Sequence, residues 1–297
     1  MIKKPAFPIL LGVLALVCLF AAWQPAQASP ATVPFFLKIM AFGDSITSSI
    51  GDGGCIVPKT GGPAIIPQAS YRYYLDKDLH AANIPFIFIG KVTENWCGQP
   101  LHAGQFDQHN EGHSGYTALN FLNPNDAQGN YIDTILNSVS SGTTIPNVPD
   151  IVLMHLGTNE LAQGFQISET INHLSILIDH FRAKNPNVAI LLAQIIPCAP
   201  TTHYVNPPVR TYCAQIPALN AAMPALVAQK NTAASPVVLV DQYTGFSAST
   251  TGPNADTYDG LHPQKNGEIK MADKWLAAIQ KLYSFVPKRT FFPVVLK

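Results

Sequence analysis

The sequence has few charged residues and no cluster of basic ones. Only 12% of its 297 residues are Asp, Glu, Lys or Arg, and 18 acidic side chains balance 18 basic ones. Proteins that bind nucleic acid through phosphate contacts need a basic patch or stripe. The missing basic run therefore argues against a nucleic-acid-binding protein, while 47% hydrophobic residues indicate a globular chain with a large core.

Two common chemical motifs are also missing. No Cys-x-x-Cys pair occurs, so the usual spacing of a structural zinc site is absent. No Gly-x-Ser-x-Gly occurs either, although this turn carries the nucleophile of many serine hydrolases. The nearest stretch, GHSGY at 112–116, does not match it. A serine nucleophile in this chain needs a different motif.

The first 28 residues have the pattern of a secretory signal peptide. Two lysines stand near the start, residues 8–23 are almost wholly apolar, and Ala26-Gln27-Ala28 offers small residues at the two positions that a signal peptidase reads. We expect cleavage before Ser29 and export of the protein. An uncleaved membrane anchor is the alternative, because the apolar run approaches spanning length.

Cleavage would remove Cys18 and leave four cysteines. An even number of cysteines in an exported protein indicates two disulfides. Four cysteines allow three pairings, and we favour Cys55–Cys97 and Cys198–Cys213 because each pair lies in neighbouring irregular segments. A zinc site is the weaker alternative, since no Cys-x-x-Cys spacing exists.

Short apolar runs alternate with helical patterns along the rest of the chain. Runs rich in β-branched and aromatic residues predict strands covered on both faces; they are Leu37–Phe42, Pro85–Gly90, Ile151–Leu156, Val188–Ile196 and Val237–Val240. Amphipathic periodicity predicts helices at Tyr71–Ala82, Ser168–Lys184, Ala218–Lys230 and Gly267–Tyr283. Ser168 is placed to cap the second helix, and Pro224 should kink or shorten the third.

This alternation predicts an α/β fold, a three-layer sandwich with a five-stranded parallel sheet between helices. The chain shows no internal repeat and no interdomain linker. We therefore expect one domain at residues 37–284, after an extension at 29–36 and before a tail at 285–297. In such sheets, ligands bind beyond the carboxyl ends of the strands.

Four polar motifs fall at loops on this predicted edge. Ser45 follows the first strand in IMAFGDSIT, and Asn159 follows the third in IVLMHLGTNE. Gly115 lies in the glycine-rich loop NEGHSGYTA, and Asp259 precedes His262 by three residues in YDGLHPQKNG. Serine, histidine and aspartate can supply a nucleophile, its base and the group that orients the base. A glycine N–H and an asparagine amide can stabilise an oxyanion.

Each motif alone has a plainer interpretation. Gly, Asp, Ser and Asn are ordinary turn residues, and Asp-x-x-His can simply cap a helix. Asp44 we expect to be structural, accepting hydrogen bonds that hold the loop. His109 and His113 have a metal-like spacing, but the glycines between and after them argue against a helix, so hydrogen-bonded or surface histidines are favoured. Arg72, Tyr73 and Tyr74 are candidates for the pocket wall, although an aromatic residue on a helix more often belongs to the core.

Together the motifs resemble those of the SGNH, or GDSL-type, hydrolases. GDSI at 43–46, GHSG at 112–115, GTNE at 157–160 and DGLHP at 259–263 stand in the order of that family, and the resemblance covers roughly Lys38 to Tyr283. The stretches IMAFGDSIT, EGHSGYT and DGLHPQKNGEIKMADKW resemble the acetylxylan esterases of the third family of carbohydrate esterases. The resemblance implies the flavodoxin-like three-layer fold of the SGNH hydrolases.

The resemblance also implies a role for each motif residue. Ser45 would be the nucleophile, His262 its base and Asp259 the partner of the base. The backbone N–H groups of Ser45 and Gly115 and the side-chain amide of Asn159 would form the oxyanion hole. Glu160 stands where many relatives carry Asp, and we expect little effect from this difference.

The sequence thus predicts a secreted serine esterase that forms an acyl-enzyme. By resemblance, its substrates are acetyl esters on plant polysaccharide or its oligomers. A lipolytic or lysophospholipid esterase with the same residues is one alternative, and an inactive carbohydrate-binding protein is another. No metal or organic cofactor is implied. We expect an acylated carbohydrate or small ester as the partner, with no nucleic acid and no stable membrane partner after signal cleavage.

Overall fold

A parallel β-sheet forms the centre of the structure, a computed structural model that describes residues 36–49, 69–94, 101–200 and 210–285. In the described residues the sheet has the order β2-β1-β4-β5-β6, with β3 also paired to β1. The strands are β1 (Leu37–Gly43), β2 (Phe86–Phe88), β3 (Glu111–Gly112), β4 (Ile151–His155), β5 (Ala189–Gln194) and β6 (Val237–Asp241). All the described residues belong to one compact unit, Pro34–Phe292.

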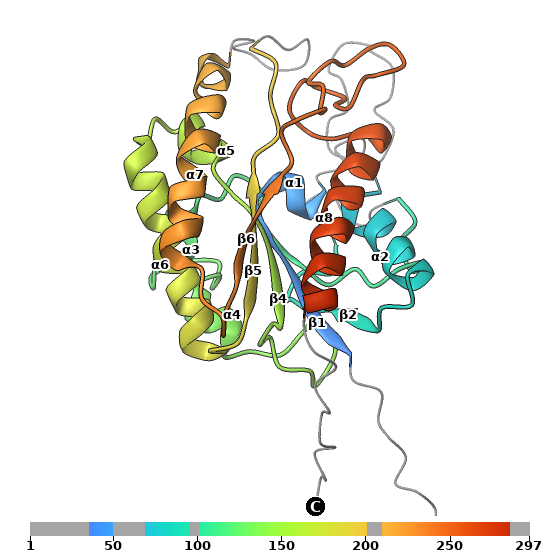
Figure 1. Cartoon of the computed structure of the whole chain (residues 1–297), viewed down its shortest axis with the longest axis vertical. Coiled ribbons are helices and arrows are strands. Elements are labelled where there is room, and N and C mark those ends of the chain that lie inside the picture. The colour runs from blue at the N-terminus through green and yellow to red at the C-terminus, as the bar shows by residue number, and fades with distance from the viewer. Residues whose placement is uncertain (1–35, 50–68, 95–100, 201–209, 286–297) are drawn as a thin grey trace, which may run out of the picture. The chain divides into compact units, whose positions relative to one another are not determined.

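Helices cover both faces of this sheet (Figure 1). Helices α2 (Tyr71–Ala81) and α8 (Lys265–Phe285) pack on one face, where they bury Ile39 and Ala41 of β1. Helices α6 (Ile167–Lys184) and α7 (Ile216–Lys230) cover the other, over Met40 and Phe42. Because neighbouring residues of β1 enter opposite cores, its apolar run is continuous. The predicted three-layer α/β fold is confirmed.

Five predicted strands are present, and β3 is an additional one that the sequence analysis did not anticipate. It has only two residues, Glu111 and Gly112, and therefore no apolar run that a pattern can detect. It pairs with the last two residues of β1, beyond the point where β2 pairs with the first three. Two short strands thus share one edge of β1.

The expected ends of two helices differ from the structure. Helix α6 begins at Ile167, and its first turn is closed by Glu169, whose carboxylate accepts a 2.8 Å hydrogen bond from the Gln166 N–H. Ser168 lies inside the helix and does not cap it. Helix α7 begins earlier than expected, at Ile216, and continues past Pro224 to Lys230, so Pro224 does not shorten it. The alternative expectation of a kink at Pro224 stays a prediction.

A side chain from the sheet replaces the hydrogen bond that Pro224 cannot make. Proline has no N–H, so the carbonyl of Asn220, four residues earlier, loses its helical donor. Gln194 of β5 donates its Nε2 hydrogen to that carbonyl at 3.0 Å. The Asn220 side chain in turn bonds both the N–H and the C=O of Ile195, at 2.8 and 2.9 Å. These bonds join α7 to the carboxyl end of β5.

Short helices occupy several of the loops. They are α1 (Ser45–Ser48), α3 (Ala118–Phe121), α4 (Ile132–Leu136), α5 (Thr158–Ala162) and the 3₁₀ helix η1 (Thr211–Gln215). The structure contains the predicted disulfide between Cys198 and Cys213, with their Cα atoms 5.4 Å apart. The expected signal peptide and the Cys55–Cys97 pair lie outside the described residues. Within the described ranges, every helix is too short or too polar to traverse a bilayer.

Candidate active site

The register of the sheet brings three of the polar loops together. Gly43, the last residue of β1, pairs with Gly112 of β3 on one side and His155 of β4 on the other. Ser45, Gly115 and Asn159 follow these three strand ends within a few residues. The candidate nucleophile therefore stands between the two loops that carry the candidate oxyanion donors, at the carboxyl edge of the sheet, where ligands of such folds bind.

Close packing explains the glycines at these strand ends. A Cβ atom on Gly43 would lie 2.4 Å from the carbonyl oxygen of His155, and one on Gly112 would lie 2.3 Å from the N atom of Ser48. Both distances are far below van der Waals contact. Side chains there would push α1 away from the sheet, so the two glycines let Ser45 sit directly on the strand ends.

Asp44 begins the helix that carries Ser45. Its Oδ1 atom accepts a 2.9 Å hydrogen bond from the Ile46 N–H, which makes it the N-cap of α1. This confirms the expectation that Asp44 is structural. Burial raises the pKa of Asp44 to about 7; the Ile46 N–H opposes this rise, and the nearby charge of Glu160 adds to it.

Arg72 holds the other end of α1. Its guanidinium is buried and donates to the carbonyls of Thr47 at 3.1 Å and Ser48 at 3.3 Å, and to that of Gln108 at 2.6 Å. Carbonyls at the end of a helix lack helical donors, so a guanidinium can satisfy several at once. Arg72 thus fixes the turn after the nucleophile, and it is not among the residues that line the pocket described below.

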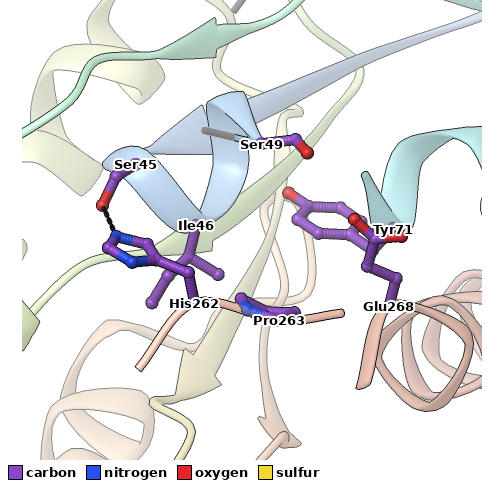
Figure 2. Close-up of a pocket in the computed structure, with 7 residues that line it drawn as sticks. All are labelled: Ser45, Ile46, Ser49, Tyr71, His262, Pro263 and Glu268. Carbon is purple, nitrogen blue, oxygen red and sulfur yellow. Dashed lines mark hydrogen bonds between the residues drawn. The ribbon is translucent and has the colours of Figure 1, made fainter. Parts of the chain in front are cut away.

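Ser45, His262 and Asp259 form a continuous chain of hydrogen bonds. The Ser45 Oγ atom lies 3.0 Å from Nε2 of His262 (Figure 2), and Nδ1 of His262 lies 3.0 Å from Oδ2 of Asp259. An ionised carboxylate only accepts hydrogen bonds, so Nδ1 carries the proton and Nε2 of the neutral ring accepts one from Ser45. This is the arrangement in which an imidazole can act as base toward a hydroxyl.

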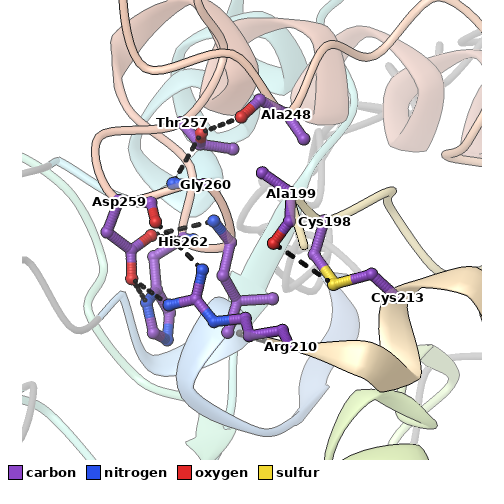
Figure 3. Close-up of a disulfide and its surroundings, with 10 residues drawn as sticks. Cys198, Ala199, Arg210, Cys213, Ala248, Thr257, Asp259, Gly260 and His262 are labelled. Atoms are coloured by element: carbon purple, nitrogen blue, oxygen red, sulfur yellow. Dashed lines mark hydrogen bonds and ion pairs between the residues drawn. A yellow bond between two sulfur atoms is a disulfide. The ribbon is translucent and has the colours of Figure 1, made fainter. Parts of the chain in front are cut away.

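A tight turn and an arginine fix the Asp259 carboxylate. Its Oδ1 atom accepts hydrogen bonds from the N–H groups of Leu261 at 2.9 Å and His262 at 2.7 Å. Arg210 donates to its Oδ2 atom at 3.1 Å and to its backbone carbonyl at 2.9 Å (Figure 3). Burial alone would raise the pKa of Asp259, but His262 and Arg210 outweigh it and hold the pKa well below its usual value. The carboxylate therefore stays charged.

Two of the three candidate oxyanion donors have no acceptor among the described residues. In the described part of the chain, nothing accepts a hydrogen bond from the backbone N–H of Ser45 or of Gly115. Gly115 has a φ of 76°, a left-handed conformation that glycine adopts without strain. Both N–H groups are thus available to an anion at this edge.

The third candidate, Asn159, already makes internal hydrogen bonds. Its Nδ2 atom donates to the Tyr116 carbonyl at 2.9 Å and, over a long 3.4 Å, to Oδ2 of Asp44. Next to it, the buried Glu160 accepts a 2.7 Å hydrogen bond from the Ala118 N–H. Asn159 and Glu160 of α5 therefore bind the residues on either side of Thr117, just after Gly115 in the chain. One amide hydrogen of Asn159 is therefore bound to Tyr116. The other makes only the long contact to Asp44, and this second hydrogen can be donated to an oxyanion.

A small pocket opens beside Ser45 and His262. It has a volume of about 10 Å³, close to the minimum for one water molecule, and its wall consists of Ser45, Ile46, Ser49, Tyr71, His262, Pro263 and Glu268. Tyr71 and Glu268 lie on the side away from Ser45 (Figure 2). Burial raises the pKa of Glu268 to about 8, so this carboxyl is largely protonated at neutral pH.

The two histidines with a metal-like spacing are hydrogen-bonded to carboxylates. His109 bonds Asp107 at 2.6 Å, and His113 bonds the buried Glu111 at 2.9 Å. They flank β3 and do not lie on a helix, as the glycines indicated. Across the described ranges, no group of three or more His, Cys, Asp or Glu side chains is arranged to hold a metal ion.

Three comparisons place the chain among esterases. Residues 41–268 match the model of the GDSL-like Lipase/Acylhydrolase family. The chain is 26% identical over 254 residues to a multidomain esterase of Ruminococcus flavefaciens, a match that covers 82% of this chain and 28% of that longer protein. The chain thus spans less than a third of this relative.

Solved structures of carbohydrate esterases share the fold. A carbohydrate esterase family 3 protein from Talaromyces cellulolyticus matches with a TM-score of 0.59 and 26% identity, over 85% of this chain and 100% of that one. A family 3 carbohydrate esterase from Clostridium thermocellum matches with a TM-score of 0.56, 26% identity and the same coverage, 85% and 100%. With the family match over most of the domain, the chain belongs to the GDSL-like lipase/acylhydrolase family.

Proposed function

We propose that the protein is an exported serine esterase that removes acetyl groups from polysaccharides or oligosaccharides. Ser45 is the nucleophile, His262 the base and Asp259 the group that orients the base. The observation that carries the proposal is the unbroken hydrogen-bond chain from Ser45 through His262 to a charged Asp259, next to two N–H groups that no acceptor in the described residues occupies. A purely structural loop needs neither feature.

The reaction follows from this geometry. Nε2 of His262 takes the proton of Ser45 as Oγ attacks the carbonyl carbon of the ester. The negative oxygen of the tetrahedral intermediate accepts hydrogen bonds from the N–H groups of Ser45 and Gly115 and from the Asn159 amide. His262 then gives the proton to the departing alkoxide, which leaves as an alcohol. Water attacks the acyl-enzyme by the same route and releases the acid.

Similarity to solved structures supports a carbohydrate substrate. The relatives from Talaromyces cellulolyticus and Clostridium thermocellum are carbohydrate esterases that the chain matches over their whole length. Export is supported by the signal-like first 28 residues and by the disulfide at Cys198–Cys213, since disulfides persist in oxidising compartments.

Ester hydrolysis by purified protein tests the proposal. Rates should be measured on p-nitrophenyl esters from acetate to laurate, and by acetate release from acetylated xylan, for wild type and for Ser45→Ala. We expect the highest kcat/KM on the acetyl ester, release of acetate from xylan, and loss of several orders of magnitude in Ser45→Ala. Rates that rise with chain length would favour the lipolytic alternative. A wild-type protein that hydrolyses none of these esters would indicate the carbohydrate-binding alternative.

A further inference from the structure

We propose that Arg210 is a positioning residue that acts through Asp259: it holds the carboxylate toward His262, and its positive charge sets how far the activity extends to low pH. We further propose that the Cys198–Cys213 disulfide keeps Arg210 in this position. The inference rests on the proposed function, because it assigns Arg210 a part in the same reaction. Figure 3 shows the residues concerned.

Both hydrogen bonds that the Arg210 side chain makes in the described residues are with Asp259. One guanidinium nitrogen binds the Asp259 carbonyl at 2.9 Å and the other binds its Oδ2 atom at 3.1 Å. Both side chains of this ion pair are about nine-tenths buried, with exposed fractions of 10% and 8%. A two-point contact to backbone and carboxylate fixes the residue against both rotation and displacement.

His262 and Arg210 share one oxygen of the carboxylate. Oδ2 of Asp259 lies 3.0 Å from Nδ1 of His262 and 3.1 Å from Nη2 of Arg210. A protonated His262 would therefore place a second positive charge close to that of Arg210, in a site with little solvent. The repulsion opposes protonation of the base, so Arg210 extends the activity to lower pH.

Other groups near His262 do not provide this effect. The titratable and charged groups near it within the described residues are Asp259, Arg210, Asp44, Tyr258, whose ring stacks on the imidazole with the ring centroids 5.8 Å apart, and, across the pocket, Tyr71 and Glu268. Asp44 and Asp259, when ionised, favour a protonated imidazole, whereas phenol groups near pH 7 and a protonated Glu268 carry no charge. Arg210 is the member of this set with a permanent positive charge.

The disulfide joins two segments that each contact the turn at residues 259–260: the segment that contains Ala199 and the segment that contains Arg210. On one flank, Ala199, next to Cys198, donates its N–H to the carbonyl of Gly260 at 2.7 Å. On the other, Arg210 accepts a 3.1 Å hydrogen bond from the N–H of Cys213. Bridging Cys198 to Cys213 therefore keeps the two contacts with residues 259–260 in register.

The pH dependence of kcat/KM separates this role from a merely structural one. In Arg210→Gln the positive charge is lost, so the acid limb of the profile should move to higher pH by about one unit. Arg210→Lys retains a charge but not the planar fork; its acid limb should stay near that of wild type while kcat falls by roughly tenfold. The double variant Cys198→Ser/Cys213→Ser should shift the limb in the same direction as Arg210→Gln, by a smaller amount.

Arg182→Gln is the matched control. Arg182 also donates its guanidinium hydrogens to a serine, Ser235, at 2.9 Å to the hydroxyl and 2.7 Å to the carbonyl. Ser235 lies just before β6, however, at the amino edge of the sheet and away from the candidate site. Its variant should lose stability without moving the acid limb. Thermal melts across the pH range confirm that each rate refers to folded protein.

An Arg210→Gln enzyme with a lower rate but the wild-type acid limb would overturn the proposal. If Arg210→Gln does not fold, an Arg210→Lys enzyme with unchanged kcat, or with a limb shifted by a full unit, overturns it instead. Failure of the proposed function looks different. In that case wild-type protein shows no hydrolysis that depends on Ser45, and no acid limb exists to compare.

Discussion

At the scale of single residues, Asn159 makes the sharpest test of the oxyanion hole. If its amide stabilises charge that appears only in the transition state, Asn159→Ala should lower kcat by about 10²–10³-fold and leave KM within about threefold. Initial rates on an acetyl ester, taken beside thermal melts, measure both effects. The amide also holds the Tyr116 carbonyl at 2.9 Å, so some loss of stability is expected as well.

Gln163→Ala is the control for Asn159. Gln163 follows the same short helix and donates to the carbonyl of Gly115 at 3.4 Å, so it touches the loop without offering a donor to the oxyanion. Its variant should keep kcat within about threefold. An Asn159→Ala protein with a clearly lowered melting temperature but a near-normal rate per folded molecule would reduce Asn159 to a loop-holding residue.

The motif residues of the site could be predicted from the sequence, whereas the two arginines that position them could not. Ser45 and Asn159 stand directly after apolar runs, and Asp259 precedes His262 by three residues, so local pattern and motif resemblance find them. Arg210 and Arg72 contact groups 49 and 25 positions away in the chain. A single arginine in an irregular segment or a helix carries no local signal of such a partner, and only the fold brings the two together.

At the scale of elements, Pro224 is a residue inside α7 that lowers the stability of the helix and can be replaced. Proline in a helix interior costs about 3 kcal/mol, and proline also stabilises by about 1 kcal/mol through the unfolded chain. Pro224 is exposed and Gln194 already supplies the missing donor to Asn220. Pro224→Ala should therefore raise the free energy of unfolding by about 1–2 kcal/mol and leave the esterase rate unchanged. Urea unfolding measures this, and a less stable variant would show that proline is needed at this position.

Strands and long helices could be predicted, whereas short elements and helix ends could not. A strand buried on both faces has to be apolar, and a long amphipathic helix repeats its pattern over several turns. Helix α3 has four residues and forms because Thr117 and Asn120 exchange hydrogen bonds at its start. Such a helix has no period to detect. For α6, the contact between Gln166 and Glu169 decided the start, although Ser168 looks like the better cap.

At the scale of the whole molecule, the thiol count tests the proposal of export. The exported chain should contain two disulfides, Cys198–Cys213 and the predicted Cys55–Cys97, and no free thiol. Labelling denatured, unreduced protein from the culture medium with a maleimide should add nothing to its mass, and peptide mapping should find both pairs. Closing a loop of 15 residues is worth about 3 kcal/mol, so reduction should lower the melting temperature. Four free thiols would contradict export to an oxidising compartment.

The layered α/β architecture of the chain followed from its alternating pattern, because strand and helix periods determine which faces must be buried. The substrate did not follow in the same way. One fold carries many activities, and the groove that selects a substrate is built from loops with no period of their own. The resemblance to carbohydrate esterases therefore supports the proposed substrate more than any local pattern does.

Trapping the acyl-enzyme tests the central claim most directly. Wild-type protein mixed with p-nitrophenyl acetate and quenched in acid during the first turnover should gain the mass of one acetyl group, and peptide mapping should place it on Ser45. Neither Ser45→Ala nor His262→Ala should gain it at a comparable rate. An acetyl group on another residue, or full hydrolysis by Ser45→Ala, would contradict the assignment of Ser45 as the nucleophile.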